Sequence, residues 1–256
     1  MEDQVQLRAY GKAPQPTLVY LPGLHGDWTL IGGFRRQLRE RARFVEFTYP
    51  RTLTWSLQDY AGGVEAALRE NGMSEGWLLG ESFGSQVAWQ IVERKQFKVS
   101  GIILAGGFVR HPFGNTARVV GKIAGRTSIT LRTRLLRRYT QIARFRFRRA
   151  PETISDLREF IARRTELDYQ AIKHRLDLVA DSDPRPVARK TKIPVYALSG
   201  FFDPIVPPFP VRSWLRRHCP CLRDYRVVWA ADHNVLNCAP RAAAEQVVEW
   251  MNDEPS

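Results

Sequence analysis

The chain has 256 residues, 44% of them hydrophobic, and includes 7 Trp, 8 Tyr and 13 Phe. This is ample material for one buried core, and the length suits a single α/β domain with an insertion. The composition excludes an intrinsically disordered chain. The formal net charge of +13 is concentrated, because residues 110–149 hold eleven Arg and one Lys and no acidic residue.

The amino terminus carries acidic residues where a secretory signal needs a basic start. The longest apolar run, residues 101–109, is about half the length of a membrane span. Three cysteines are an odd count for a disulfide framework. We therefore expect a cytoplasmic protein without a membrane span. A zinc site could be drawn from His218, Cys219, Cys221 and Cys238, but their spacing fits no familiar pattern, so we expect no metal.

Hydrophobic patterning predicts alternating strands and helices. The expected strands are 4–10, 17–21, 43–49, 77–79, 101–105, 194–198 and 225–229. The expected helices are 27–40, 56–71, 83–94, 211–217 and 241–251. This order predicts an α/β fold with a mostly parallel central sheet flanked by helices. From 111 to 191 the pattern is helical only, so we expect a catalytic core of residues 1–110 and 192–256 with a helical cap or lid inserted at 111–191.

A G-x-S-x-G motif, Gly80–Gly84, lies between a predicted strand and a predicted helix. At such a junction the chain turns sharply around the serine, and glycine at the flanking positions lets backbone segments approach each other. The motif alone is a weak signal. In this context it makes Ser82 a candidate nucleophile.

A serine nucleophile needs a histidine to take its proton and an acid to orient that histidine. Asp203 follows the predicted strand 194–198, and His233 follows the predicted strand 225–229. Both therefore belong to loops at the carboxyl ends of strands, as the serine does. Asp232 is adjacent to the histidine and badly placed to orient it. Ser82, Asp203 and His233 are the predicted catalytic triad.

Hydrolysis of an acyl group also requires donors for the developing oxyanion, which backbone N–H groups can supply. Phe83 follows the nucleophile, and Leu24 lies in the loop after strand 17–21. These two residues are the predicted oxyanion hole. The possible substrate pocket comprises His25, Trp28, Phe108 and Phe202.

Four segments, Leu21–Asp27, Gly80–Gly84, Gly200–Asp203 and Asp232–His233, together resemble the α/β-hydrolase superfamily, in particular small esterase-like or acyltransferase-like members. The order Ser, Asp, His matches that superfamily. Where many members carry His-Gly before the oxyanion residue, this chain has Pro22-Gly23. The resemblance implies a serine hydrolase that cleaves a carboxylic ester or thioester through an acyl-enzyme, with no metal or organic cofactor.

Two alternatives remain open. The same triad could transfer an acyl group to another acceptor or cleave an amide. In a different class, the chain could be an inactive binding protein that works through its basic cap. The arginines could attract a small anionic substrate or an anionic membrane surface, whereas no nucleic-acid-binding motif accompanies them, so we expect no nucleic acid partner.

Overall fold

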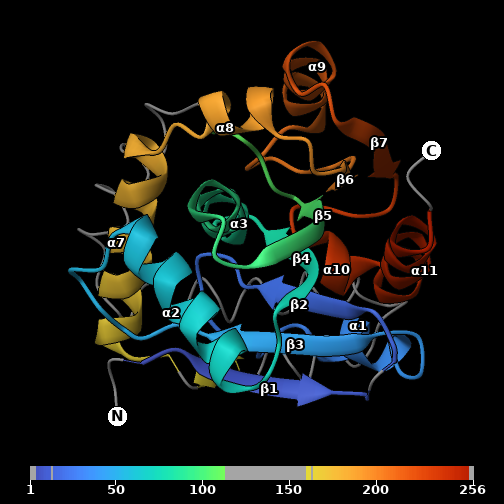
Figure 1. Ribbon diagram of the computed structural model, residues 1–256. Coiled ribbons are helices and arrows are strands. Elements are labelled where there is room, and N and C mark those ends of the chain that lie inside the picture. Colours follow the sequence, from blue (N-terminus) through green and yellow to red (C-terminus); the bar gives the residue numbers. More distant parts are fainter. Residues whose placement is uncertain (1–3, 13, 113–159, 163, 254–256) are drawn as a thin grey trace.

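A computed structural model of the chain describes residues 4–12, 14–112, 160–162 and 164–253. These residues form a seven-stranded sheet with the order β1-β3-β2-β4-β5-β6-β7 (Figure 1). The strands are β1 (Gln6–Tyr10), β2 (Thr17–Leu21), β3 (Arg43–Thr48), β4 (Glu75–Glu81), β5 (Lys98–Ala105), β6 (Val195–Gly200) and β7 (Leu222–Val228). β1 runs antiparallel to β3, and every other described pair is parallel. The predicted mostly parallel sheet is confirmed.

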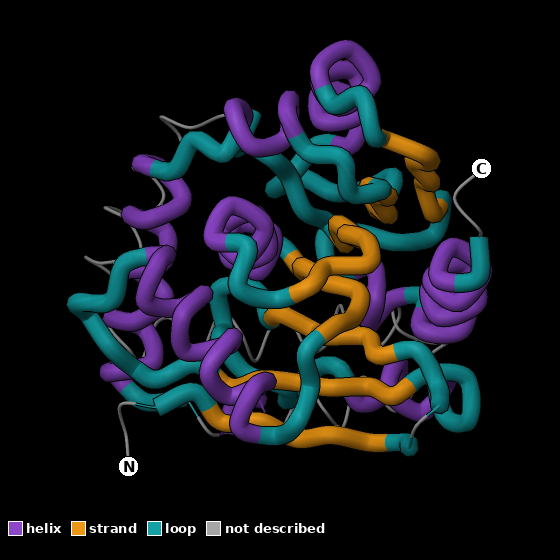
Figure 2. Tube along the Cα trace, viewed as in Figure 1, coloured by secondary structure: helices purple, strands orange, loops and turns teal. Residues whose placement is uncertain are grey.

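Helices cover both faces of this sheet (Figure 2). They are α1 (Gly32–Gln37), α2 (Leu57–Glu70), α3 (Gly84–Arg94), α7 (Glu166–Asp181), α8 (Arg185–Lys190), α9 (Pro208–His218), α10 (Val235–Cys238) and α11 (Pro240–Met251). One buried cluster joins the sheet to α2, α3, α7, α8 and α9, and a second joins it to α1, α10 and α11. Successive side chains of β2 point to opposite faces of the sheet, so Val19 belongs to the first cluster and Tyr20 to the second.

The helix predicted at 56–71 is confirmed as α2. Ser56 is the N-cap, and its hydroxyl accepts a hydrogen bond from the backbone N–H of Asp59, whose carboxylate accepts one from the N–H of Ser56. This reciprocal capping satisfies two N–H groups that the first turn leaves without partners. The helix ends at Glu70, one residue before the predicted end at 71.

A helix was expected at 27–40, but the observed helix α1 is much shorter and begins only at Gly32. Asp27 accepts a hydrogen bond from the N–H of Thr29, and the N–H of Ile31 donates to the carbonyl of Trp28. These local turns compete with helical hydrogen bonding, and residues 22–31 form a loop instead. The short helix α10 was not expected from the sequence.

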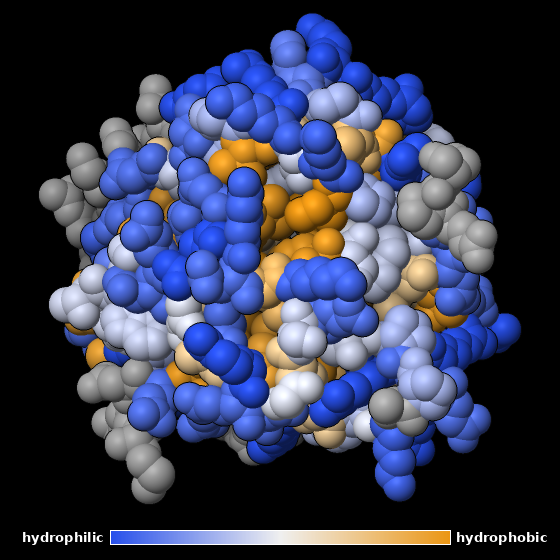
Figure 3. All heavy atoms as spheres, in the orientation of Figure 1, coloured by the Kyte–Doolittle hydropathy of each residue, from blue (hydrophilic) through white to orange (hydrophobic). Residues whose placement is uncertain are grey.

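The predicted insertion at 111–191 lies largely outside the described residues. Its described parts include α7 and α8, which are helical, as is the short segment at 160–162. The division into a core and a cap stays a prediction. The face seen in Figure 3 is mostly hydrophilic, with hydrophobic residues gathered in a band near its centre, where Figure 1 shows β4 and β5.

Candidate active site

Ser82 occupies a sharp turn between β4 and α3. Its φ of 50° lies in the left-handed region, which costs a non-glycine residue about 1–3 kcal/mol. The turn is held by a hydrogen bond of 3.1 Å from the N–H of Ser82 to the carbonyl of Ala105. It also packs directly on the end of β2, because a Cβ atom at Gly84 would lie 2.0 Å from the carbonyl oxygen of Leu21. The glycine of the motif is therefore required by a backbone contact.

Three side chains from separate loops form one hydrogen-bonded chain. The Ser82 Oγ lies 2.9 Å from His233 Nε2, and His233 Nδ1 lies 2.8 Å from Asp203 Oδ2. The structure thus brings together the three residues that the sequence suggests as a triad. Their side chains are largely shielded, with exposures of 11% for His233 and 0% for Asp203. Shielding from water strengthens these interactions.

Asp203 is anchored by the main chain of its own loop. Its Oδ1 accepts hydrogen bonds from the N–H groups of Ile205 and Val206, at 2.9 and 2.8 Å, which leaves Oδ2 directed at the imidazole. A carboxylate in this position selects the tautomer with a proton on Nδ1, so that Nε2 can accept the serine proton. The neighbouring Asp232 instead accepts from the N–H of Asn234 and the thiol of Cys238.

The two residues predicted to hold an oxyanion lie in adjoining backbone segments. Phe83 is the N-cap of α3, where N–H groups have no helical partners and the helix dipole favours negative charge. Leu24 lies in a turn closed by a hydrogen bond of 2.9 Å from the N–H of Gly26 to the carbonyl of Gly23. Gly84 lies against the carbonyl oxygens of Leu21 and Pro22, so the serine turn is in contact with the start of the Leu24 loop.

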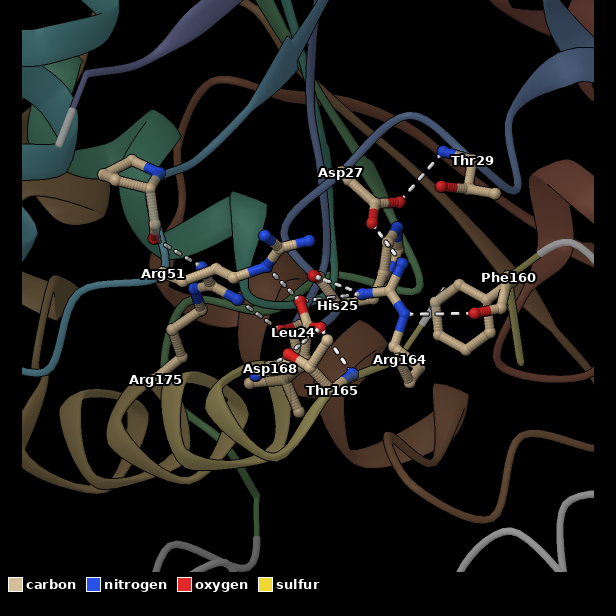
Figure 4. A network of polar contacts seen from close by, with 11 residues as sticks. Leu24, His25, Asp27, Thr29, Arg51, Phe160, Arg164, Thr165, Asp168 and Arg175 are labelled. Atoms are coloured by element: carbon tan, nitrogen blue, oxygen red, sulfur yellow. Dashed lines mark hydrogen bonds and ion pairs between the residues drawn. The ribbon is translucent and has the colours of Figure 1, made fainter. Parts of the chain in front are cut away.

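Two arginines contact the Leu24 loop: Arg175, which lies on α7, and Arg164, which lies just before that helix (Figure 4). Arg175 donates to the carbonyl of Leu24 at 2.9 Å and to that of Pro50 at 3.0 Å. Arg164 pairs with the carboxylate of Asp27 and donates to the carbonyl of His25 at 3.4 Å. Sequence reasoning did not single out either residue. A signal existed for Arg175, because it shares the buried stripe of α7 with Ala171 and Val179.

Acidic partners extend this arginine network. Asp168 caps α7 by accepting from Thr165 and pairs with Arg51 at 2.6 Å and Arg164 at 3.6 Å. Burial alone would raise the pKa of Asp168, but hydrogen bonds from Thr165 and Arg51 outweigh it and the pKa falls below its ordinary value. Burial likewise opposes ionisation of Asp27, whose pKa is nevertheless lowered by the charges of His25 and Arg164. Both carboxylates are held in their charged form.

The four predicted pocket residues have different environments. The His25 ring packs edge-on against Phe160, and Trp28 lies beneath the guanidinium of Arg8, 4.1 Å from the ring centroid. Phe108 is 2% exposed within the core, whereas Phe202 is 62% exposed.

Phe202 belongs to an aromatic group beside Asp203. Phe201 stacks on Trp229 with ring centroids 4.2 Å apart and meets Phe202 and Phe209 edge-on. Trp229 is 70% exposed. The loops that carry the carboxylate and the imidazole therefore also present an apolar surface.

Within the part of the chain that the structure describes, no group of three or more His, Cys, Asp or Glu side chains is arranged to hold a metal ion. Among the same residues, no helix combines the length and apolar character of a membrane span.

A mostly parallel sheet with a strained serine turn after β4, a carboxylate after β6 and an imidazole after β7 defines the α/β-hydrolase fold. Solved structures of α/β hydrolases and esterases resemble the whole chain. A hydrolase from Pseudomonas aeruginosa PA01 has a TM-score of 0.79 at 13% identity, covering 97% of this chain and 94% of its own. MGS-M2, an α/β hydrolase from a Medee basin deep-sea metagenome library, has a TM-score of 0.75 at 13% identity, covering 98% and 95%.

A thermophilic esterase from Thermogutta terrifontis has a TM-score of 0.74 at 19% identity, covering 96% of this chain and 92% of its own. At such identities the likeness shows the fold alone. No protein-family model and no curated protein matches the sequence.

Proposed function

We propose that this protein is a serine hydrolase that cleaves a carboxylic ester or thioester. The observation that supports this most is the unbroken chain of hydrogen bonds from Ser82 through His233 to Asp203, with links of 2.9 and 2.8 Å. Each link is within the distance needed for proton transfer or for orientation of the imidazole. The esterases among the structural neighbours support the same class of reaction.

The proposed reaction has two halves. His233 takes the proton of Ser82 as its Oγ attacks the acyl carbon, and then gives that proton to the leaving alcohol or thiol as the scissile bond breaks. Water, deprotonated by the same imidazole, attacks the acyl-serine and releases a carboxylic acid while the proton returns to Ser82. Asp203 stabilises the imidazolium in both halves.

The N–H groups of Leu24 and Phe83 are the proposed donors to the tetrahedral oxyanion. Removal of one such donor typically raises the barrier by about 3 kcal/mol. A donor is effective only if it already points to the place where charge develops, so the conformation of the Leu24 loop governs this contribution.

We propose a small substrate with an apolar acyl group, which the exposed rings of Phe202 and Trp229 would contact. The net charge of +13 favours an anionic group elsewhere on the substrate, or contact with an anionic membrane surface. A cytoplasmic location is part of this proposal.

The test is a chain-length series of p-nitrophenyl esters and acyl thioesters with wild type and Ser82→Ala. We expect Ser82→Ala to lose about 10⁴-fold or more in kcat and all labelling by a fluorophosphonate probe. Equal rates in the two proteins would remove the proposal. Assays with an added alcohol or thiol acceptor separate hydrolysis from acyl transfer, because a transferase forms the acylated acceptor in place of the free acid.

A further inference from the structure

The turn that carries Leu24 is held at each of its carbonyl groups. The carbonyl of Gly23 accepts from the N–H of Gly26 at 2.9 Å, and that of Gly26 accepts from the N–H of Tyr49 at 2.7 Å. Between them, the carbonyls of Leu24 and His25 accept from Arg175 and Arg164. Two of the four contacts thus come from side chains that are 139 and 151 residues away in the sequence.

Arg175 is an unusual residue to find in this position, because it is 2% exposed. Among the described residues, no carboxylate lies within ion-pair distance of it. Its guanidinium instead donates to the carbonyls of Leu24 and Pro50 and lies 5.7 Å from the ring centroids of both Tyr49 and Tyr60. Burying a cation without a paired anion is costly, so a simple packing role would be filled better by an apolar side chain.

The glycine at the end of the turn is matched to this arginine. Gly26 has a φ of +77°, and a Cβ atom there would lie 2.4 Å from Arg175 Nη1. Gly26 therefore serves two purposes: it permits the left-handed backbone, and it leaves the space that the guanidinium occupies.

We propose that Arg175, assisted by Arg164, is a positioning residue that fixes the N–H of Leu24 as a donor to the oxyanion. The inference rests on the proposed function, since it assigns a role within that same reaction. The N–H of Leu24 belongs to the peptide group whose carbonyl is that of Gly23, and the carbonyl that Arg175 holds belongs to the next peptide group. With both peptide planes held, the donor cannot rotate away.

This arrangement links the reaction centre to the chain segment between β5 and β6. Arg175 lies on α7, and Arg164 lies just before it. Displacing α7 would displace two carbonyl contacts of the donor turn without touching Ser82, Asp203 or His233. The position of α7 would then influence the rate of the reaction.

The test compares Arg175→Lys, Arg175→Met and Arg164→Gln with wild type and with a control, Arg189→Met. Arg189 is exposed on α8, and its guanidinium lies 5.9 Å from the Trp214 ring centroid. A donor to the oxyanion acts on the transition state alone, so kcat and kcat/KM should fall together while KM changes little. We expect losses of about 10–100-fold for both Arg175 variants, of which lysine is the milder, and a smaller loss for Arg164→Gln. The control should keep the wild-type kcat.

A second readout separates positioning from stability. Affinity for a boronic acid that forms a tetrahedral adduct with Ser82 should fall by the same factor as kcat/KM, measured well below each variant's melting temperature. Folded Arg175 variants with kcat and boronate affinity within twofold of wild type would overturn the inference. If the Arg175 variants do not fold, unchanged kcat and boronate affinity in Arg164→Gln would overturn it. Failure of the proposed function is seen separately, as an inactive wild type or an active Ser82→Ala.

Discussion

The two halves of the candidate oxyanion site are held by different physical forces. The serine turn is fixed by main-chain contacts, with Gly84 packed against the carbonyl of Leu21 and the N–H of Ser82 bonded to Ala105. The Leu24 loop is fixed in part by buried charged side chains, Arg175 and Arg164. The first half should be insensitive to charge and intolerant of any added atom. The second should respond to pH, to distant substitutions and to movement of α7.

The largest expected effect comes from Asp203→Asn, which lies outside both halves and removes the charge that orients His233. The remaining amide oxygen can still accept from the N–H groups of Ile205 and Val206, so the loop should keep its shape. The amide nitrogen would then face His233 and select the wrong tautomer, and kcat should fall about 10⁴-fold. Steady-state kinetics with a p-nitrophenyl ester measure this. A fall of less than tenfold would contradict the role given to Asp203.

Gly84→Ala should be the most damaging to stability. Its Cβ would lie 2.0 Å from a backbone oxygen of β2, which cannot move without distorting the sheet. We expect a loss of more than about 3 kcal/mol in the free energy of unfolding, or no folded protein. Urea denaturation followed by circular dichroism measures this, and a variant as stable as wild type would show that the serine turn is not fixed by this contact.

Gly26→Ala is the matched substitution in the other half. Its Cβ would meet the tip of the Arg175 side chain, which can be displaced more easily than a backbone. We expect a folded protein that has lost about 10–100-fold in kcat, with KM nearly unchanged. The comparison between the two glycines would fail if Gly26→Ala kept full activity or if it destroyed the fold as Gly84→Ala does.

Low pH should weaken the ion pairs that hold the Leu24 loop. The pKa of Asp27 is lowered in the folded protein, so its contribution is complete above the ordinary value of 3.8 and is lost as pH falls through the folded value. At pH 7, Asp27→Asn should cost about 1–2 kcal/mol of stability, because the negative charge paired with Arg164 is removed. The difference from wild type should shrink as pH falls below 3.8 and through the lowered folded pKa of Asp27. A difference that stayed constant from pH 7 to pH 2, in urea titrations of the two proteins, would contradict the assigned charge state.

The smallest expected effect is at the exposed edge of the network. Arg51 pairs with Asp168 at 2.6 Å, but its side chain is 52% exposed. Solvent screening limits such a pair to about 0.2–1 kcal/mol, so Arg51→Gln should lower the melting temperature only slightly and leave kcat unchanged. A loss comparable to that of Asp27→Asn would show that the arginine network acts as a single unit.

Local patterns in the sequence determined much of this protein. Strand 17–21 and the capped helix after Ser56 follow from short-range periodicity and from capping chemistry, and the structure has both. The positions of Ser82, Asp203 and His233 after strands also follow from local patterns, since each lies next to a recognisable strand. The helix expected from 27 begins only at Gly32, because local turns at Asp27 and Trp28 replace its first hydrogen bonds.

Tertiary structure alone decided which side chains meet. Ser82 and His233 are 151 residues apart, and only the packing of parallel strands places them 2.9 Å from each other. Phe108 is a pocket candidate in the sequence, and tertiary packing leaves it 2% exposed within a buried cluster. Arg175 looks like one of many arginines, and its role follows from the partner carbonyls that surround it. Local propensity depends on neighbours along the chain, whereas the environment of a charged group depends on neighbours in space.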